Sequence, residues 1–213
     1  MPRTIVLQAM MTRQPSNANA RIAVAAMLAF ALTACVGAPH GRPASGGAYR
    51  PVRDTPVRIG PPYTIRGVTY TPRADPGYDR LGYASWYGPE SGSRTANGER
   101  FRPDGISAAH TTLPLPTYAE VTSLDTGRTI LVRINDRGPF RPGDRFIIDL
   151  SRGAAEQLGM RRQGIAPVRV RVVEPPESDR ARLREGRPAH ERRRMSERDV
   201  ARLRSRLESA GSR

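Results

Sequence analysis

The sequence predicts an all-β domain, a closed or nearly closed barrel of six short strands with one short helix. Six β-favouring runs lie between Gly82 and Val173, and turn residues separate them. Only one segment of this region has helical character. Closure is expected because about 92 residues in short strands would otherwise leave exposed sheet edges.

Alternation of apolar and polar residues defines the strands most clearly near the middle of the domain. Ile130, Val132 and Ile134 fall on one face, whereas Leu131 and Arg133 fall on the other. This period of two is typical of a half-buried strand. The six expected strands cover residues 82–87, 106–109, 118–124, 128–135, 146–150 and 166–173.

The one helix of the domain is expected over residues 151–158. Ser151 can cap its first turn, and Gly159 can end it. The barrel domain as a whole is expected to occupy residues 82–174.

Both flanks of the domain differ from it in composition. Residues 35–61 are rich in proline and glycine and are expected to form a tether. A lead-in segment follows at 62–81, where Tyr63 to Tyr70 can form a hairpin around Arg66 and Gly67.

The tail, residues 175–213, is rich in arginine and acidic residues. Ser196 and Asp199 offer a capping box, and Val200, Leu203 and Leu207 follow at helical spacing. Because this apolar stripe is thin, we expect a solvated helix or a partly disordered segment, with a dedicated binding helix as the alternative.

The amino terminus reads as an export signal over residues 1–34. The apolar run Ile22–Leu32 is too short to span a bilayer, which needs about 20 residues. It ends in Leu-Thr-Ala-Cys, which resembles a bacterial lipobox and makes Cys35 a candidate for lipidation. An ordinary secretory peptide with an incidental cysteine is the alternative.

The chain is strongly basic, with 35 basic and 20 acidic residues and a net charge of +15. Such a charge suits nucleic acid, a lipid surface or a cell-wall polymer, and the export signal disfavours nucleic acid. A single cysteine excludes an intramolecular disulfide and a multi-cysteine metal site. We expect no cofactor and no metal, and a monomer.

Two acids, one histidine and a group of aromatic residues could carry chemistry. Asp136 follows a strand and precedes Arg137-Gly-Pro, so it either caps a turn or is presented by it. Glu99 follows the Asn97-Gly98 turn and projects from the end of an element. His110 ends an apolar strand, where a structural role is the usual one. Trp86 and Tyr87, with Tyr83, either pack in the core or form a platform for sugars.

Two acids, a histidine and aromatic residues would together suit glycosidic bond cleavage. That reaction needs a carboxylic acid to protonate the leaving oxygen and usually a second carboxylate near the oxocarbenium-like centre. The residues alone do not show that these groups converge.

Several motifs, taken in order, resemble the RlpA family, the rare lipoprotein A or septal-ring lytic transglycosylases. They cover most of residues 82–173, with the lead-in at Tyr63–Tyr70: Gly82-Tyr-Ala-Ser-Trp-Tyr-Gly88, Thr95-Ala-Asn-Gly-Glu99, Ala108-Ala-His110-Thr-Thr-Leu-Pro114, Val132-Arg-Ile-Asn-Asp136-Arg-Gly-Pro139 and Ile148-Asp-Leu-Ser151.

The resemblance implies a double-psi β-barrel that cleaves peptide-poor peptidoglycan glycan strands without water and leaves 1,6-anhydro-muramyl ends. It implies Asp136 as general acid and then base, Glu99 as second carboxylate and His110 as an orienting hydrogen-bond partner. We expect Trp86, Tyr87, Asn97 and Arg137 to contact substrate. Asp136 needs a raised pKa, so Arg137 should face away from it, paired with Asp149 or Asp144.

The resemblance also bears on location and partners. The tail is too short and too charged for the SPOR domain that ends many family members. Val36 replaces the aspartate that retains lipoproteins at the inner membrane, so we expect an outer-membrane lipoprotein facing the periplasm. The expected partners are peptidoglycan and, through Cys35, the membrane. A non-catalytic wall-binding lipoprotein with an expansin-like barrel is the alternative.

Overall fold

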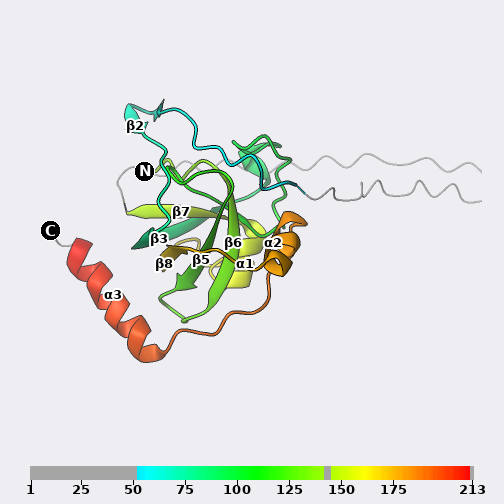
Figure 1. Ribbon diagram of the computed structural model, residues 1–213. Coiled ribbons are helices and arrows are strands. Elements are labelled where there is room, and N and C mark those ends of the chain that lie inside the picture. The colour runs from blue at the N-terminus through cyan, green and yellow to red at the C-terminus, as the bar shows by residue number, and fades with distance from the viewer. Residues whose placement is uncertain (1–51, 142–144, 212–213) are drawn as a thin grey trace, which may run out of the picture. The chain divides into compact units, whose positions relative to one another are not determined.

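Six strands close into a barrel in the computed structural model, which describes residues 52–141 and 145–211. The strands follow the order β3-β7-β4-β6-β5-β8, and β8 pairs back onto β3 (Figure 1). β3 with β7 and β4 with β6 run parallel, and the other pairs are antiparallel. The predicted all-β class, a six-stranded double-psi β-barrel, is confirmed. The strands are β3 (Asp79–Tyr87), β4 (Ser107–Ala109), β5 (Thr117–Ser123), β6 (Thr129–Asp136), β7 (Phe146–Ser151) and β8 (Ala166–Val172).

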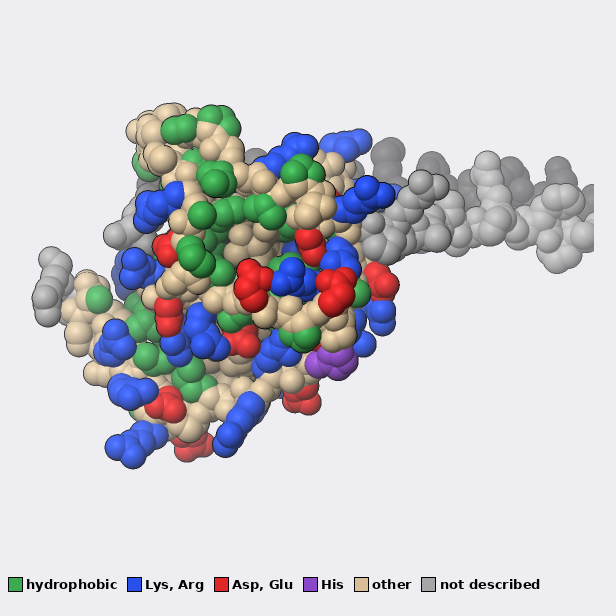
Figure 2. All heavy atoms as spheres, viewed as in Figure 1, with side chains coloured by type: hydrophobic (Ala, Val, Ile, Leu, Met, Phe, Trp, Pro, Cys, Tyr) green, Lys and Arg blue, Asp and Glu red, His purple; other side chains and the backbone are tan. Residues whose placement is uncertain are grey.

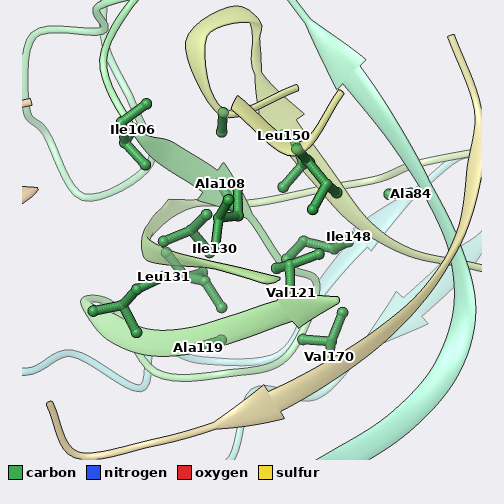
Figure 3. Packing of buried hydrophobic residues seen from close by; sticks show 14 of the residues in the cluster. Ala84, Ile106, Ala108, Ala119, Val121, Ile130, Leu131, Ile148, Leu150 and Val170 are labelled. Carbon is green, nitrogen blue, oxygen red and sulfur yellow. The ribbon is translucent and has the colours of Figure 1, made fainter. Parts of the chain in front are cut away.

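The barrel interior is filled by one face of every strand. Ala119 and Val121 of β5 stand opposite Val132 and Ile130 of β6, and all four side chains are at most 2% exposed. Figure 3 shows Val121, Ile148 and Val170 meeting from three strands. The two faces predicted for residues 130–134 are present, with Ile130, Val132 and Ile134 turned to the interior. The strand is not half-buried as predicted, because Leu131 and Arg133 on the other face are each only 2% exposed.

Helix α1 (Arg152–Leu158) follows β7 and contacts the barrel, with the caps that the sequence predicts. The Ala154 amide donates to Ser151 Oγ at 3.2 Å, and Gly159 ends the helix in the left-handed region. A short 3₁₀ helix, η1 (Pro89–Ser91), follows β3.

The predicted hairpin is present as β1 (Tyr63–Ile65) and β2 (Val68–Tyr70). Arg66 and Gly67 both have positive φ, 51° and 80°, as a tight two-residue turn requires. Tyr63 and Tyr70 stack on each other and contact the ring of Phe140, four residues after Asp136. Residues 62–81 thus bring an aromatic cluster beside the turn that follows β6.

Residues 52–61 do not behave as the tether predicted for 35–61. Arg58 and Leu115 exchange backbone hydrogen bonds of 2.8 Å, and Asp54 forms an ion pair with Arg133 of β6. The prediction from composition was wrong for this stretch, because a proline-rich segment can still attach through its carbonyl groups and one well-placed carboxylate.

The tail folds into two helices, α2 (Glu177–Arg184) and α3 (Glu197–Gly211), which contact the barrel. Ser196 caps α3 as predicted by accepting from the Asp199 amide at 3.2 Å. Leu183 and Leu203 are buried, so the thin apolar stripes are covered rather than solvated. Arginines and acids are interspersed over the face seen in Figure 2.

The signal peptide expected at 1–34 and the lipidation site Cys35 lie outside the described residues. Within residues 52–141 and 145–211, no helix has the length and apolar character needed to cross a membrane.

Candidate active site

Strand β6 ends in an irregularity that directs Asp136. Arg133 and Ile134 pair with Ser107 and Ala108 of β4, but the next residue of β4, Ala109, pairs with Asp136. Asn135 is therefore an extra residue, a β-bulge. Residues that stand directly opposite each other share one face of a sheet, so the bulge places Asp136 on the outer face with Arg133. Simple alternation would have turned it towards the interior, like Ile134.

The Asp136 carboxyl group is partly buried and held by two backbone amides. Ala96 and Arg137 each donate their N–H to Oδ1 at 2.8 Å. Burial raises the pKa of Asp136 above its ordinary value, and the two amides and the Arg137 charge only oppose this. The second oxygen, Oδ2, accepts no hydrogen bond from the described residues. This is the state that a general acid needs.

A second carboxyl group stands on the same row of the barrel. Ala109 pairs with Asp136 on one side and with Asp149 of β7 on the other, so all three side chains share the outer face. Two strand spacings separate the acids, about 10 Å between Cα atoms. The residue between them is alanine, so no large side chain fills the gap.

The pKa of Asp149 is also raised above its ordinary value. Burial raises its pKa, and a hydrogen bond from the Ser85 hydroxyl and the charge of Arg141 oppose the increase. The turn after Asp136 passes close by, because a Cβ added to Gly138 would lie 3.5 Å from Ala109 Cβ and 3.7 Å from Asp149 Oδ2. Asp149 and the Asp136 turn thus belong to one site.

Tyr87 lies beneath this row and faces both acids. Its hydroxyl is buried and forms no hydrogen bond of normal geometry with the described residues. Burial raises the pKa of Tyr87 and the charge of Asp136 adds to the increase, while a hydrogen bond with the Ser107 side chain opposes it; the charge of Asp149 adds a smaller increase. The buried phenol therefore lies close to both acids and to the Ser107 side chain.

Glu99 is fixed by a different set of contacts. Arg133 donates to both carboxylate oxygens, at 2.7 and 2.9 Å, and the side-chain amides of Asn97 and Asn135 each add a bond of 2.8 Å. Each carboxylate oxygen accepts two hydrogen bonds, so the Glu99 side chain is fixed in one orientation.

One loop joins Glu99 to Asp136. Residues 95–98 form a tight turn in which the Gly98 amide donates to Thr95 O at 2.8 Å. The Ala96 amide of this turn binds Asp136, while Asn97 and Glu99 bind Asn135 of the bulge. The two predicted acids therefore converge on the same end of β6, in different roles.

A family model described as lytic transglycolase matches residues 80–170. The endolytic peptidoglycan transglycosylase RlpA of Pseudomonas aeruginosa is 51% identical over 116 residues, covering 54% of this chain and 33% of the relative. The RlpA protein of Neisseria meningitidis is 39% identical over 151 residues, covering 70% and 62%. The barrel domain belongs to the RlpA family.

The chain spans from a third to somewhat under two thirds of the length of these RlpA relatives. Among solved structures, the Streptomyces papain inhibitor matches with a TM-score of 0.40 and 23% identity, over 48% of this chain and all of the inhibitor.

His110 lies in this RlpA barrel as a structural residue. Its ring is buried, and Nδ1 accepts from the amides of Thr112 and Leu113 at 3.1 Å each. Burial, with the nearby Arg137 charge, lowers the pKa of His110 to about 3, so the ring is neutral. The orienting role predicted for His110 stays a prediction, and in the described residues its Nδ1 is used by the backbone of the turn.

Arg137 pairs with no acid within residues 52–141 and 145–211. Its guanidinium donates to the carbonyl oxygens of His110, Leu113 and Ile59, while Asp149 binds Ser85; Asp144 lies outside the described residues. The prediction of an ion pair with Asp149 was wrong, since three backbone acceptors satisfy the guanidinium. Arg137 thus braces the backbone beside the site, and its contact with substrate stays a prediction.

The two aromatic residues predicted to contact substrate, Trp86 and Tyr87, lie on opposite faces of β3 and do not form one platform. Tyr87 stacks on Phe101 with ring centroids 4.9 Å apart, so it supports the row from below. Trp86 pairs with Leu150, on the face opposite to Ser85 and Tyr87, and lines a separate hollow of about 760 Å³ with residues 156–163. The side-chain amide of Asn97 donates to Glu99, and its contact with substrate stays a prediction.

Sequence reasoning named Asp149 only as a partner for Arg137 and missed its place in the site. An acid inside the apolar run Phe146–Leu150 was the available indication. Within the described ranges, no group of three or more His, Cys, Asp or Glu side chains is arranged to hold a metal ion.

Proposed function

We propose that this chain is an endolytic lytic transglycosylase that cleaves the glycan strands of peptidoglycan and leaves 1,6-anhydro-muramyl ends. One observation carries the proposal. Two carboxyl groups whose pKa values burial raises, Asp136 and Asp149, share an outward row of a barrel of the RlpA family. The RlpA relatives are named for this reaction.

The reaction follows from the two carboxyl groups. Protonated Asp136 donates its proton to the glycosidic oxygen, and the bond from that oxygen to C1 of the muramyl residue breaks. The positive charge that develops on the muramyl ring is stabilised by ionised Asp149. Asp136, now ionised, accepts the proton of the muramyl 6-hydroxyl, whose oxygen bonds to C1. The proton count closes without water, and Asp136 ends protonated.

Glu99 supports this reaction without exchanging a proton. Its four hydrogen bonds hold the loop whose Ala96 amide binds Asp136 Oδ1. This contact leaves Oδ2 as the oxygen that carries the reacting proton.

A wall-binding protein without catalysis is the second candidate, because a binding surface can retain the same acids. The test incubates peptide-stripped sacculi with the full chain and with its Asp136→Asn variant. If the protein is an enzyme, the wild type should release soluble anhydro-muramyl fragments and the variant should release none. Sedimentation of both proteins with intact sacculi, without soluble fragments, would instead support the binding protein.

We further propose that the protein is exported and anchored to the outer membrane through lipid on Cys35. The short apolar run Ile22–Leu32 and the Leu-Thr-Ala-Cys sequence support this, as does Val36. Mass spectrometry of the membrane-extracted amino terminus, with Cys35→Ser as control, tests the lipid. Density-gradient separation of the two membranes tests the location.

A further inference from the structure

Arg133 is a buried arginine on the outer face of the barrel, with 2% of its side chain exposed. Its guanidinium is shared between two acids. Nη1 and Nη2 donate to Glu99, and Nε donates to Asp54 at 3.0 Å. A buried guanidinium needs its partners, because removing one of them leaves charge that water does not compensate.

Asp54 is itself held from three directions. The Tyr118 hydroxyl of β5 lies 2.8 and 2.9 Å from its two oxygens, and Arg184 of α2 donates to Oδ2 at 2.8 Å. The carbonyl of the preceding residue, Arg53, accepts from Arg133 Nη2 at 3.1 Å. Burial alone would raise the pKa of Asp54, but hydrogen bonds from Arg184, Tyr118 and Arg133 hold it below its ordinary value.

These contacts form a continuous chain to the reacting group. Arg184 and Asp54 fix Arg133, Arg133 fixes Glu99, and the loop that carries Glu99 places the Ala96 amide on Asp136. Two arginines and two carboxylates balance each other in charge along this route.

Both ends of the chain of contacts come from outside residues 80–170, the range that the family model matches. Asp54 belongs to the segment before the hairpin, and Arg184 belongs to the tail. The segment before the hairpin and the tail are therefore both linked to one side chain of β6, Arg133, through Asp54.

We propose that Asp54 and Arg184 are positioning residues that set Glu99, and through it Asp136, by way of Arg133. The inference rests on the proposed function and deepens it. The two flanks complete the site, and the family-matched barrel alone lacks part of it.

The test uses the full chain with Asp54→Asn, which keeps the size of the side chain and removes its charge. Asp79→Asn is the matched control, because Asp79 pairs with Arg169 on β8 and has no contact with this route. We expect kcat on peptide-free glycan strands to fall about 10- to 100-fold in Asp54→Asn, since small displacements of reacting groups have effects of this size. KM should stay within about twofold, and Asp79→Asn should leave both constants unchanged.

A second variant separates positioning from general damage to the fold. In a Glu99→Gln background, Asp54→Asn should add little further loss, because both substitutions act on one route. Equal kcat for Asp54→Asn and Asp79→Asn, or fully additive losses with Glu99→Gln, would overturn the inference.

One measurement does not depend on activity and keeps the two proposals apart. Hydrogen exchange of the Ala96 amide should accelerate in Asp54→Asn and in Arg184→Gln, and should remain at the wild-type rate in Asp79→Asn. If the wild type is inactive but exchange of the Ala96 amide is faster in the two variants, the proposed function is contradicted and the positioning role is not. Unchanged exchange would overturn the positioning role whether or not the wild type is active.

Discussion

Asp136 and Asp149 are both register partners of Ala109, one on each side of β4, and their side chains therefore lie on the same outer row of the barrel. Neither acid would have this relation to the other without the bulge at Asn135. Burial raises the pKa of both carboxyl groups, so proton exchange is possible at pH values where an ordinary aspartate is fully ionised.

Replacing Asp136 should cost activity and improve stability. Asp136→Asn removes the reacting proton, so kcat should fall about 10²- to 10⁴-fold. An asparagine still accepts from the Ala96 and Arg137 amides, and it avoids an ionised group at a buried site. Urea unfolding at pH 7 should show a gain of roughly 0.5–2 kcal/mol.

That gain should depend on pH in one direction. Because the folded-state pKa of Asp136 is raised, the wild type recovers stability as the pH falls through that pKa towards the ordinary value of 3.8. The difference between Asp136→Asn and the wild type should shrink over this range. A constant difference from pH 7 to pH 4 would argue against a raised pKa.

Asp149 should be needed in its ionised form. Asp149→Asn should lower kcat by about 10²-fold, the size expected when one charge that stabilises a transition state is lost. Ser85→Ala keeps the carboxyl group but removes a hydrogen bond that lowers its pKa, so the acid limb of the pH–rate profile should move to higher pH. An unchanged profile in Ser85→Ala would exclude Asp149 as the group behind that limb.

His110 should make the fold sensitive to acid. Its pKa is lowered to about 3 by burial, so between about pH 6.5 and pH 3 the unfolded chain binds a proton that the folded chain does not. Stability should fall in this window by roughly 1.4 kcal/mol per pH unit from this group. His110→Asn keeps an acceptor for the Thr112 and Leu113 amides and should remove this part of the slope in urea titrations.

Gly138 should be sensitive because of its backbone. Its φ of 145° is open to glycine and strained for other residues, so Gly138→Ala should cost about 1–3 kcal/mol. Gly164→Ala, at φ 76° with open space around its Cα, is the matched control. Thermal melts should show a loss in both variants, and activity should fall only in Gly138→Ala. Equal activity in both would mean that this turn does not shape the site.

Local pattern was enough to predict the barrel strands, the hairpin and the capped helix α1. Alternation such as that of Ile130, Val132 and Ile134 depends on burial of one face and is visible within a few residues. The contacts of the flanks were not predicted. Arg133, in the middle of a buried strand, was the residue that required partners, and one of them, Asp54, lies 79 positions away.

The sequence predicted which residues lie in the site better than it predicted what each of them does. Motifs identified Asp136, Glu99 and His110, and all three lie near the end of β6. Donors distant in the sequence decide which acid keeps an oxygen without a hydrogen bond. Arg133 donates to Glu99, whereas Asp136 accepts through Oδ1 and keeps Oδ2 open in the described residues. The bulge depends on how β6 pairs with β4, and pairing between distant strands cannot be read from either segment alone.

In the proposed reaction, Asp136 passes a proton to the leaving oxygen and recovers one from the muramyl 6-hydroxyl, with no water consumed. Cleavage of peptide-free glycan strands in heavy-oxygen water, followed by mass spectrometry of the new muramyl ends, tests it most directly. We expect anhydro ends that carry no heavy oxygen. Reducing ends with one heavy-oxygen atom each would show hydrolysis and contradict it.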